Sequence, residues 1–255
     1  IVEQTSGTSG VPARFVKTRE ERCALAMAIW RRRKKFDPLI TLRNFVPLFH
    51  LPPGARLPVD PFEPSDAGVR SFYEWLDAAG GRWLHLPPVL LDRHARALQR
   101  LGWKNPAPRL KYIETSGAPL RPEVMQATRA ALDVTLVNQY GIREVWAIGY
   151  SSGNEGFGIL DEAVAVELID EGGAVIDAGG VTGSVIGTSK ILQLLPLVRY
   201  VTGDRGCWRD TPGGRVLELG GDRDATMLFF RRRWVSGTEV FKPALGDNTD
   251  RFVPY

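Results

Sequence analysis

The feature that most constrains the fold is a regular alternation of helix and strand patterns between residues 66 and 141. Three segments have the apolar spacing, early proline or terminal glycine of helices: 66–81, 90–102 and 120–133. The apolar runs beside them have the length and composition of buried strands: 83–88, 110–117 and 134–141. Strands joined by helices at this spacing pair in parallel, with right-handed crossovers. The sequence therefore predicts an α/β fold built on a parallel sheet.

The segments before this region are less regular. Residues 19–34 have acidic residues early, apolar residues in the middle and basic residues late, which predicts a helix aligned with its own dipole. Residues 42–64 are rich in proline and predict short or irregular strands. Asp66 is one possible N-cap of the next helix, and Gly80-Gly81 is its predicted stop.

After Tyr150 the pattern changes to short strands separated by Gly, Pro and Asp turns. These predicted strands are 163–170, 183–189, 197–204, 206–210 and 215–221. Such spacing favours an antiparallel sheet or a small, distorted β-barrel. We therefore divide the chain into an α/β part (1–150), a β-rich part (151–230) and a connecting segment (231–255).

Composition excludes several classes of protein. The 255 residues, 44% hydrophobic and 24% charged, are typical of a globular protein, and no apolar run could span a bilayer. Cys23 and Cys207 are too few for a disulfide framework or zinc cluster, which favours reduced thiols in the cytoplasm. The basic runs 31–35 and 231–233 have few interleaved aromatic residues, so we interpret them as solvated surfaces rather than nucleic-acid sites.

One segment, TSGTSGVP at residues 5–12, has two readings. It is an ordinary turn before a strand, or a loop that holds phosphate through backbone N–H groups and the hydroxyls of its serines and threonines. It is not a Walker A loop, because no Gly-Lys-Ser/Thr follows at the required place.

Four later segments allow a similar pair of readings, as plain turns or as parts of a nucleotide site. ETSGAPLRPE (114–123) and VNQYGIREVW (137–146) each follow a strand of the α/β region, where open sheets bind ligands. LVRYVTGDRG (197–206) places Asp204 where a carboxylate could accept hydrogen bonds from a ribose diol. LGGDRDATM (219–227) could be a simple hairpin turn.

Taken in order, these five segments resemble motifs of the adenylate-forming superfamily of acyl- and aryl-CoA ligases. TSGTSGVPA matches the family's TSGTTGxPK phosphate loop, and TSGAPL matches its adenine-side SGGAPL loop. YGIRE, YVTGD and GDRDA match its YGxTE, YxTGD and GRxDD motifs. The stretch 183–204 is most similar to the phenylacetate–CoA ligase-like branch. The resemblance implies a large N-terminal domain whose parallel sheet precedes the β-rich part, with most of a small C-terminal domain outside the chain.

The resemblance also implies a set of site residues. The ATP- or AMP-binding residues would be Thr5, Ser6, Gly7, Thr8, Ser9, Gly10, Ser116, Gly117, Ala118, Pro119, Asn138, Gln139, Tyr140, Gly141, Asp204 and Arg223. Glu144 would hold Mg²⁺, and Glu144, Arg143 and Thr5 would act in catalysis.

Some positions depart from the family pattern. Arg143 replaces the threonine or serine of YGxTE, and it could either bind phosphate through its guanidinium or block the pocket. Ala225 replaces the second acidic residue of the hinge motif, and the family's C-terminal lysine has no identifiable counterpart.

The implied function is activation of a carboxylic acid, aryl or hydrophobic in that branch, by ATP. The acyl-adenylate would then pass to CoA, a carrier protein or an amine. The alternative is a degenerate module that binds a nucleotide or a partner without turnover. Aromatic residues such as Trp83, Tyr73 and Trp146, together with His85 and Phe72, could line an acid pocket or belong to the core, and we assign the histidines no role.

Overall fold

The computed structural model describes residues 1–4, 14–48, 57, 59–61, 65–152, 156–220, 227–230 and 233–236. The chain forms two units whose segments interleave. The α/β unit contains Ile29–Gly141 and Gly149–Phe157, and the β-rich unit contains Ile1–Ala28, Ile142–Ile148 and Gly158–Tyr255. Helix α1 (Arg19–Phe36) contributes residues to both units.

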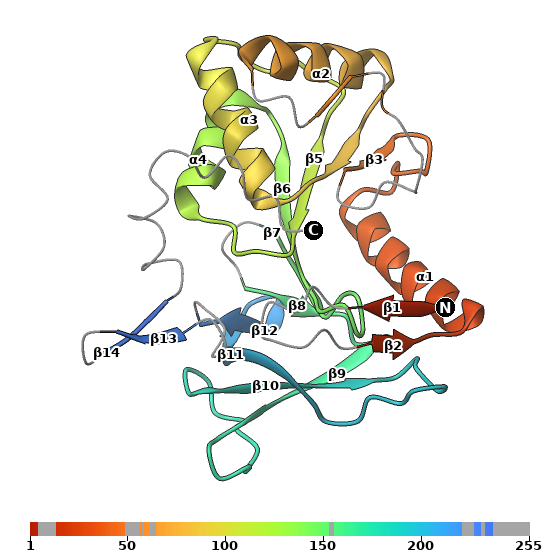
Figure 1. The fold of residues 1–255 in the computed structure, drawn as a ribbon, viewed down its shortest axis with the longest axis vertical. Helices are drawn as coiled ribbons and strands as arrows, with labels where there is room; N and C mark the ends of the chain where they lie inside the picture. The colour runs from red at the N-terminus through yellow and green to blue at the C-terminus, as the bar shows by residue number, and fades with distance from the viewer. Residues whose placement is uncertain are drawn as a thin grey trace. The chain divides into compact units, whose positions relative to one another are not determined.

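The α/β unit is built on a sheet whose strands alternate with helices (Figure 1). In chain order its elements are β3 (Phe45–Pro47), α2 (Asp66–Ala78), β4 (Trp83–His85), α3 (Pro88–Arg100), β5 (Tyr112–Ser116), α4 (Pro122–Ala131), β6 (Thr135–Tyr140) and β7 (Gly149–Ser152). Strands β3, β4, β5 and β6 pair in parallel in that order, and β7 pairs with β6 antiparallel. The predicted parallel α/β fold is confirmed.

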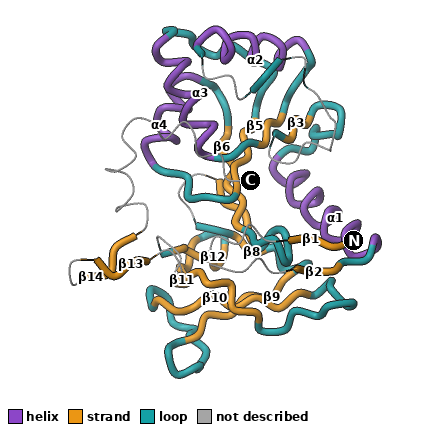
Figure 2. The backbone as a smooth tube through the Cα atoms, in the orientation of Figure 1, coloured by secondary structure: helices purple, strands orange, loops and turns teal. Residues whose placement is uncertain are grey.

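The core of this unit lies where helices α2, α3 and α4 pack against the parallel strands. Figure 2 shows α3 and α4 running side by side, in agreement with their contacts. The side chains that fill this space include Phe72, Leu76, Leu91, Leu98 and Ile113, all fully buried. Strand β4 is buried along its whole length, and so are the three central residues of β5.

The N-terminus of α2 differs from the prediction. Ser65, not Asp66, is the N-cap, and its side chain accepts a hydrogen bond from the Gly68 N–H at 3.0 Å. Asp66 is the first helical residue and pairs with Arg100 of α3 at 2.6 Å. Either residue type can cap a helix, and the serine that precedes the helix takes the role. The predicted stop is confirmed, because Gly80 has a φ of +72°, which favours glycine.

The β-rich unit contains strand pairs and a larger antiparallel sheet. Its strands are β1 (Val2–Gln4), β2 (Arg14–Val16), β8 (Gly158–Ile159), β9 (Val164–Ile169), β10 (Thr182–Ser189), β11 (Tyr200–Thr211), β12 (Gly214–Leu219), β13 (Met227–Phe230) and β14 (Arg233–Ser236). Strands β12, β11, β10 and β9 form the antiparallel sheet in that order, and β1–β2 and β13–β14 form separate antiparallel pairs. The predicted change from parallel to antiparallel pairing is confirmed.

One predicted break in this sheet is wrong. The segments 197–204 and 206–210 are not two strands, because β11 runs continuously from Tyr200 to Thr211. The pairing register with β10 shifts between Ser184 and Ile186, and Gly203 in the opposing segment has a φ of +80°. The strand therefore accommodates its glycine as a β-bulge instead of ending there.

Candidate functional site

The first group of predicted site residues lies at the carboxyl ends of β5 and β6 in the α/β unit. Ser116 is the last residue of β5 and pairs in register with Gln139 of β6. Gly117 follows with a φ of +85°, and Gly117, Ala118 and Pro119 form an exposed turn before α4. A positive φ at Gly117 lets the chain turn at the strand end, where parallel sheets bind ligands.

The β6 side of this group is partly covered. Asn138 and Gln139 are half-buried, and Asn138 accepts a hydrogen bond from the Thr115 hydroxyl at 3.3 Å. Tyr140 is buried, and its ring lies 5.6 Å from the ring of Phe157, centroid to centroid. Gly141 is the last residue of this segment of the α/β unit. The structure thus brings the predicted residues 116–119 and 138–141 together on neighbouring strand ends.

A buried ionic cluster lies directly behind the loop that follows β5. Glu114 is fully buried and accepts two hydrogen bonds from Arg33, from Nε at 2.7 Å and from Nη2 at 2.8 Å. The indole of Trp83 donates to the same carboxylate at 3.0 Å. His85 Nε2 lies 4.0 Å from Glu114 and 2.9 Å from the Ser116 hydroxyl. The cluster therefore connects the core to the first residue of the predicted adenine-side loop.

This cluster corrects one interpretation from the sequence. Arg33 belongs to the basic run 31–35 but is buried in an ion pair, not part of a solvated surface. Of the two readings left open for Trp83, Phe72 and Tyr73, their full burial in the α/β unit favours the core. His94, also buried, bonds to the Pro61 carbonyl at 2.9 Å, and burial lowers the pKa of its imidazole to about 4.

The Glu114 cluster predicts a specific dependence of stability on pH. Burial alone would raise the pKa of Glu114, but the charge of Arg33, with His85 and the hydrogen bonds from Arg33 and Trp83, holds it below the ordinary 4.5. A lowered folded-state pKa adds stability above the unfolded-state pKa, and this contribution is lost as pH falls through the folded-state pKa. Urea unfolding at a series of pH values, from pH 7 into the acid range, should show that loss. The free energy of unfolding should fall less steeply with pH in Glu114→Gln, because the amide cannot titrate. Equal pH dependence of the two proteins would show that Glu114 does not cause the loss.

The predicted phosphate-loop residues Thr5, Ser6, Gly7, Thr8, Ser9 and Gly10 lie outside the described residues, as does Arg223. The two strands that flank this segment are described. In the β-rich unit, β1 and β2 pair antiparallel, with Gln4 opposite Arg14 and Val2 opposite Val16. Residues 5–13 therefore connect the two strands of a hairpin.

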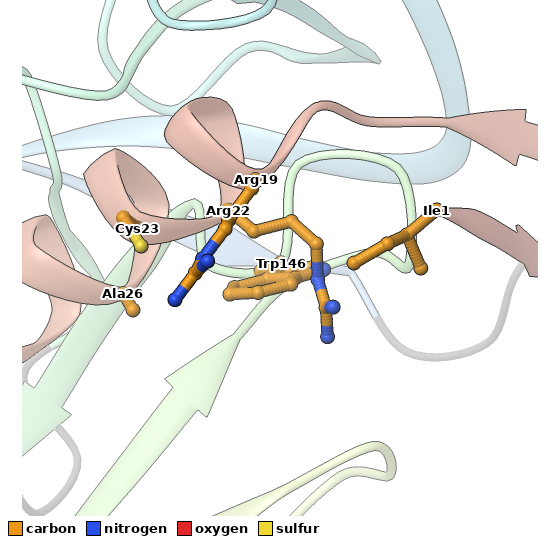
Figure 3. Close-up of a pocket in the computed structure, with 6 residues that line it drawn as sticks. All are labelled: Ile1, Arg19, Arg22, Cys23, Ala26 and Trp146. Atoms are coloured by element: carbon orange, nitrogen blue, oxygen red, sulfur yellow. The ribbon is translucent and has the colours of Figure 1, made fainter.

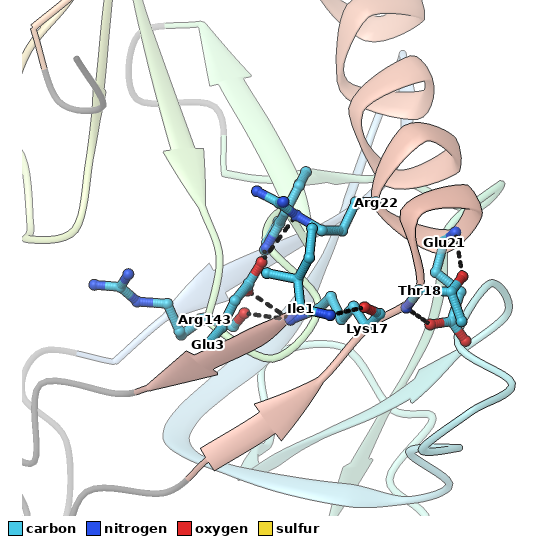
Figure 4. Close-up of polar contacts among 8 residues, drawn as sticks. Ile1, Glu3, Lys17, Thr18, Glu21, Arg22 and Arg143 are labelled. Atoms are coloured by element: carbon cyan, nitrogen blue, oxygen red, sulfur yellow. Dashed lines mark hydrogen bonds and ion pairs between the residues drawn. The ribbon is translucent and has the colours of Figure 1, made fainter. Parts of the chain in front are cut away.

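The base of this hairpin is held by a buried lysine. Lys17, which follows β2, is fully buried and donates to Glu3 Oε2 at 2.8 Å and to the Arg143 carbonyl at 3.2 Å (Figure 4). The Trp146 indole donates to Glu3 Oε2 at 3.0 Å, and Arg22 Nε lies 3.3 Å from Glu3 Oε1. Partial burial would raise the pKa of Glu3, but the hydrogen bonds and these cations lower it overall.

The same unit contains Arg143 and Glu144. The Arg143 side chain is exposed and extends away from the Glu3–Lys17 pair in Figure 4. Glu144 is buried and accepts a hydrogen bond from the Tyr200 hydroxyl at 2.8 Å. The Tyr200 ring packs edge-on against Phe15 of β2, at 6.4 Å between centroids.

Glu144 suits the Mg²⁺ that the family resemblance implies. Magnesium is commonly held by one or two carboxylates together with substrate phosphates and water. Within the part of the chain that the structure describes, no group of three or more His, Cys, Asp or Glu side chains could hold a metal by itself. The carboxylate of Glu144 is of the type that would share the ion with phosphate oxygens.

Asp204 is positioned by the bulge in β11. Thr202 is buried, and its hydroxyl donates to the Val185 carbonyl at 3.0 Å and accepts from the Asp204 N–H at 3.1 Å. Bulges re-aim side chains at functional sites. Thr202 and Gly203 together thus set the direction of the half-buried Asp204 side chain.

Thr202→Val should lower the free energy of unfolding by about 1–3 kcal/mol, because it leaves buried backbone groups without partners at nearly constant shape. Thr182→Val is the matched control, since Thr182 is exposed at the start of β10. Chemical denaturation of both variants measures the difference. Equal stabilities of the two variants would show that the hydroxyl does not hold the bulge.

A pocket of about 380 Å³ in the β-rich unit is lined by Ile1, Arg19, Arg22, Cys23, Ala26 and Trp146 (Figure 3). The Arg22 guanidinium carbon lies 5.5 Å from the ring centroid of Trp146. The lining includes Trp146, an aromatic candidate for the acid pocket, but none of the predicted nucleotide-binding residues.

Sequence reasoning does not find several of these residues. The pairs Lys17–Arg143 and Arg33–Glu114 are separated by 126 and 81 positions along the chain. Tyr200 and Glu144 belong to separate motifs, and their contact is visible only in the fold. A charged residue directly after an aromatic and a β-branched apolar residue is the signal that could have flagged Lys17 and Glu114.

Comparison with solved structures identifies the fold. An open conformation of 2-hydroxyisobutyryl-CoA ligase, in complex with 2-HIB-AMP and CoA, matches with a TM-score of 0.67 and 18% identity, over 95% of this chain and 61% of that chain. O-succinylbenzoate coenzyme A synthetase from Bacillus subtilis, in complex with ATP and magnesium, matches with a TM-score of 0.63 and 15% identity. This match covers 97% of this chain and 55% of that chain. An ATP-bound RpMatB-BxBclM chimera matches with a TM-score of 0.67 and 16% identity, and this match covers 96% of this chain and 51% of that chain.

Scans against protein-family models and against curated proteins found no match. Within the described residues, no helix combines the length and the apolar character needed to cross a membrane. The chain spans 61%, 55% and 51% of the lengths of these three solved proteins. The match to the phenylacetate–CoA ligase-like branch stays a prediction. At these levels of identity the likeness concerns architecture, and this chain has the fold of acyl-CoA ligases of known structure over 95–97% of its length.

Proposed function

We propose that this chain is the larger part of an adenylate-forming ligase that activates a carboxylic acid with ATP. One observation carries the proposal. On a fold shared with acyl-CoA ligases, the motif-like segments occur in the family's order, and the described ones lie at strand ends or at a bulge. Turns that share no binding site would not be expected to match both the order of the family's motifs and these positions in the fold.

The proposed roles follow from placement. Residues 5–10, between the paired strands β1 and β2, would hold the β- and γ-phosphates. Gly117 and Ala118, in the exposed turn after β5, would let the adenine ring approach the backbone, beside the Tyr140 ring. Ser116, Pro119, Asn138, Gln139 and Gly141 would shape the same edge of the α/β unit. Asp204 and Arg223 would contact the ribose.

The chemistry requires positioning more than covalent participation. A carboxylate oxygen of the acid attacks the α-phosphorus of ATP in line, and the bond to the bridging oxygen breaks to release pyrophosphate. Glu144, which accepts a hydrogen bond from Tyr200, would direct its carboxylate oxygens to the phosphate-bound metal. Magnesium bound there with ATP would neutralise the phosphate charge.

Thr5 would donate its hydroxyl to a phosphate oxygen, and Arg143 would supply charge in place of the family's hydroxyl residue. The exposed Arg143 guanidinium favours phosphate binding over blockage of the pocket, because its side chain extends away from the buried Glu3–Lys17 pair (Figure 4).

In finer detail, we propose that the acid is aryl or hydrophobic. The acyl group would pass from AMP to CoA, a carrier-protein thiol or an amine. The adenylation subdomain corresponds to 1–150, the β-rich subdomain to 151–230 and the hinge to 231–255. We expect no nucleic-acid partner and a cytoplasmic location.

Carboxylate-dependent exchange of labelled pyrophosphate into ATP, measured on the full-length gene product, tests this function. We expect exchange only when a suitable acid is present, and no exchange with a broad panel of acids would contradict the proposal. Calorimetric titration with ATP separates the alternative, since tight binding without exchange indicates a module that binds nucleotide but does not turn over.

A further inference from the structure

Lys17 occupies a position that lysine rarely takes. It lies between β2 and α1 and is fully buried in the β-rich unit. Removing a charged amine from water is costly unless it is paired and its hydrogen bonds are satisfied. An apolar side chain would fill the same space without this cost. The buried amine of Lys17 therefore indicates a role beyond packing.

Its contacts connect segments that are far apart in the chain. Nζ lies 2.8 Å from Glu3 Oε2 on β1 and 3.2 Å from the Arg143 carbonyl, 126 positions away. The aromatic rings of Phe15 and Trp146 lie beside the amine, with centroids 6.0 Å and 5.9 Å from Nζ. Lys17 thus touches both strands of the hairpin and the residue directly before Glu144.

Glu3 completes the arrangement. Its carboxylate receives the Lys17 amine and the Trp146 indole N–H on one oxygen and lies 3.3 Å from Arg22 Nε on the other. Trp146 is two residues beyond Glu144, so the 143–146 segment is held on both sides of Glu144. The close-up in Figure 4 shows Glu3, Lys17 and Arg143 joined by these bonds.

We propose that Lys17 is a positioning residue that fixes the paired strands β1 and β2 to the segment that bears Glu144. This inference rests on the proposed function, in which Glu144 acts on the polyphosphate. Glu3 lies on β1 and Lys17 directly follows β2, so their contacts join both strands to residues 143–146. Lys17 itself touches no substrate in this proposal.

The test is Lys17→Met, which keeps length and apolar bulk but removes the charge and the donors. Calorimetric dissociation constants are measured for Mg·ATP, inorganic pyrophosphate and AMP. We expect binding of Mg·ATP and of pyrophosphate to weaken about tenfold to a hundredfold, as for other residues that orient a ligand-holding group. AMP, which lacks the β- and γ-phosphates, should keep its affinity.

Two further variants keep the test decisive. Lys35→Met removes an exposed lysine from α1 and should leave all three affinities unchanged. If Lys17→Met does not fold, Trp146→Phe removes the donor to Glu3 while keeping an aromatic ring, and it should weaken Mg·ATP but not AMP.

Equal binding of Mg·ATP by Lys17→Met and wild type, or an equal loss for Mg·ATP and AMP, would overturn the positioning role while leaving the proposed function intact. A wild-type protein that binds none of the three ligands would overturn the proposed function, and the positioning role with it.

Discussion

Replacing Glu114 with alanine is expected to lower the free energy of unfolding by about 3–5 kcal/mol, the usual result of leaving a buried charge without its partner. The side chains of Glu114 and Arg33 are 0% and 9% exposed, and two short hydrogen bonds join them. Without the carboxylate, the Arg33 guanidinium and the Trp83 indole N–H both lose their acceptor in the core. Urea denaturation monitored by circular dichroism measures the change.

Two controls separate the buried pair from a general effect of losing a charge. Asp66→Ala removes the acidic partner of an exposed pair with Arg100, whose side chains are 38% and 56% exposed, and should cost about 0–1 kcal/mol. The double variant Arg33→Met/Glu114→Leu removes both charges and should recover much of the loss. A Glu114→Ala variant as stable as Asp66→Ala would show that the ion pair does not support the α/β unit.

Glu144→Gln is expected to lower the rate of pyrophosphate exchange about a hundredfold or more, the scale seen when a preorganised charge-stabilising group is removed. The neutral amide cannot offer an anionic oxygen to Mg²⁺. Its carbonyl oxygen can still accept the hydrogen bond from Tyr200, so the fold should be retained. Exchange assays at saturating acid, with thermal unfolding alongside, measure both effects.

Glu171→Gln is the matched control, because Glu171 is exposed in the turn after β9 of the same unit. It should leave exchange unchanged. Wild-type exchange in Glu144→Gln, at wild-type stability, would remove Glu144 from the proposed site.

The fold could be predicted to the extent that it depends on local pattern. The alternation between residues 66 and 141 has the apolar periods of helix and strand, and right-handed crossovers leave few ways to pair such strands. The helix at 19–34 follows from its charge order and its central apolar residues, and it runs to Phe36 in the structure. These signals are local, so they can be read from one sequence.

Contacts between distant segments could not be predicted in the same way. Arg33 looks like part of a solvated basic run, and only the fold shows that Glu114 lies against it. The continuity of β11 depends on pairing with β10 across the bulge, whereas the glycines at 203 and 206 locally favour a break. Lys17, Tyr200 and His85 gain their roles from partners on other segments.

Within the candidate site, the motifs predict positions better than contacts. Ser116 and Gln139 come from separate motifs and lie side by side on paired strands, as expected for strand ends of one sheet. Tyr140, which the resemblance assigns to nucleotide binding, has a ring that is buried beside Phe157. A motif gives the type of residue at a strand end, and the packing around it decides how much of the ring is exposed.

The most direct test of the central claim follows the oxygen atoms of the acid. The full-length protein is incubated with ATP, Mg²⁺, an acceptor thiol and an acid, chosen by the exchange assay, whose carboxylate carries ¹⁸O. Attack of that carboxylate on the α-phosphorus, followed by thiol attack on the carbonyl carbon, transfers one labelled oxygen to AMP. We predict AMP that contains a single ¹⁸O by mass spectrometry. Formation of ADP with labelled inorganic phosphate, or AMP without label, would contradict acyl-adenylate formation.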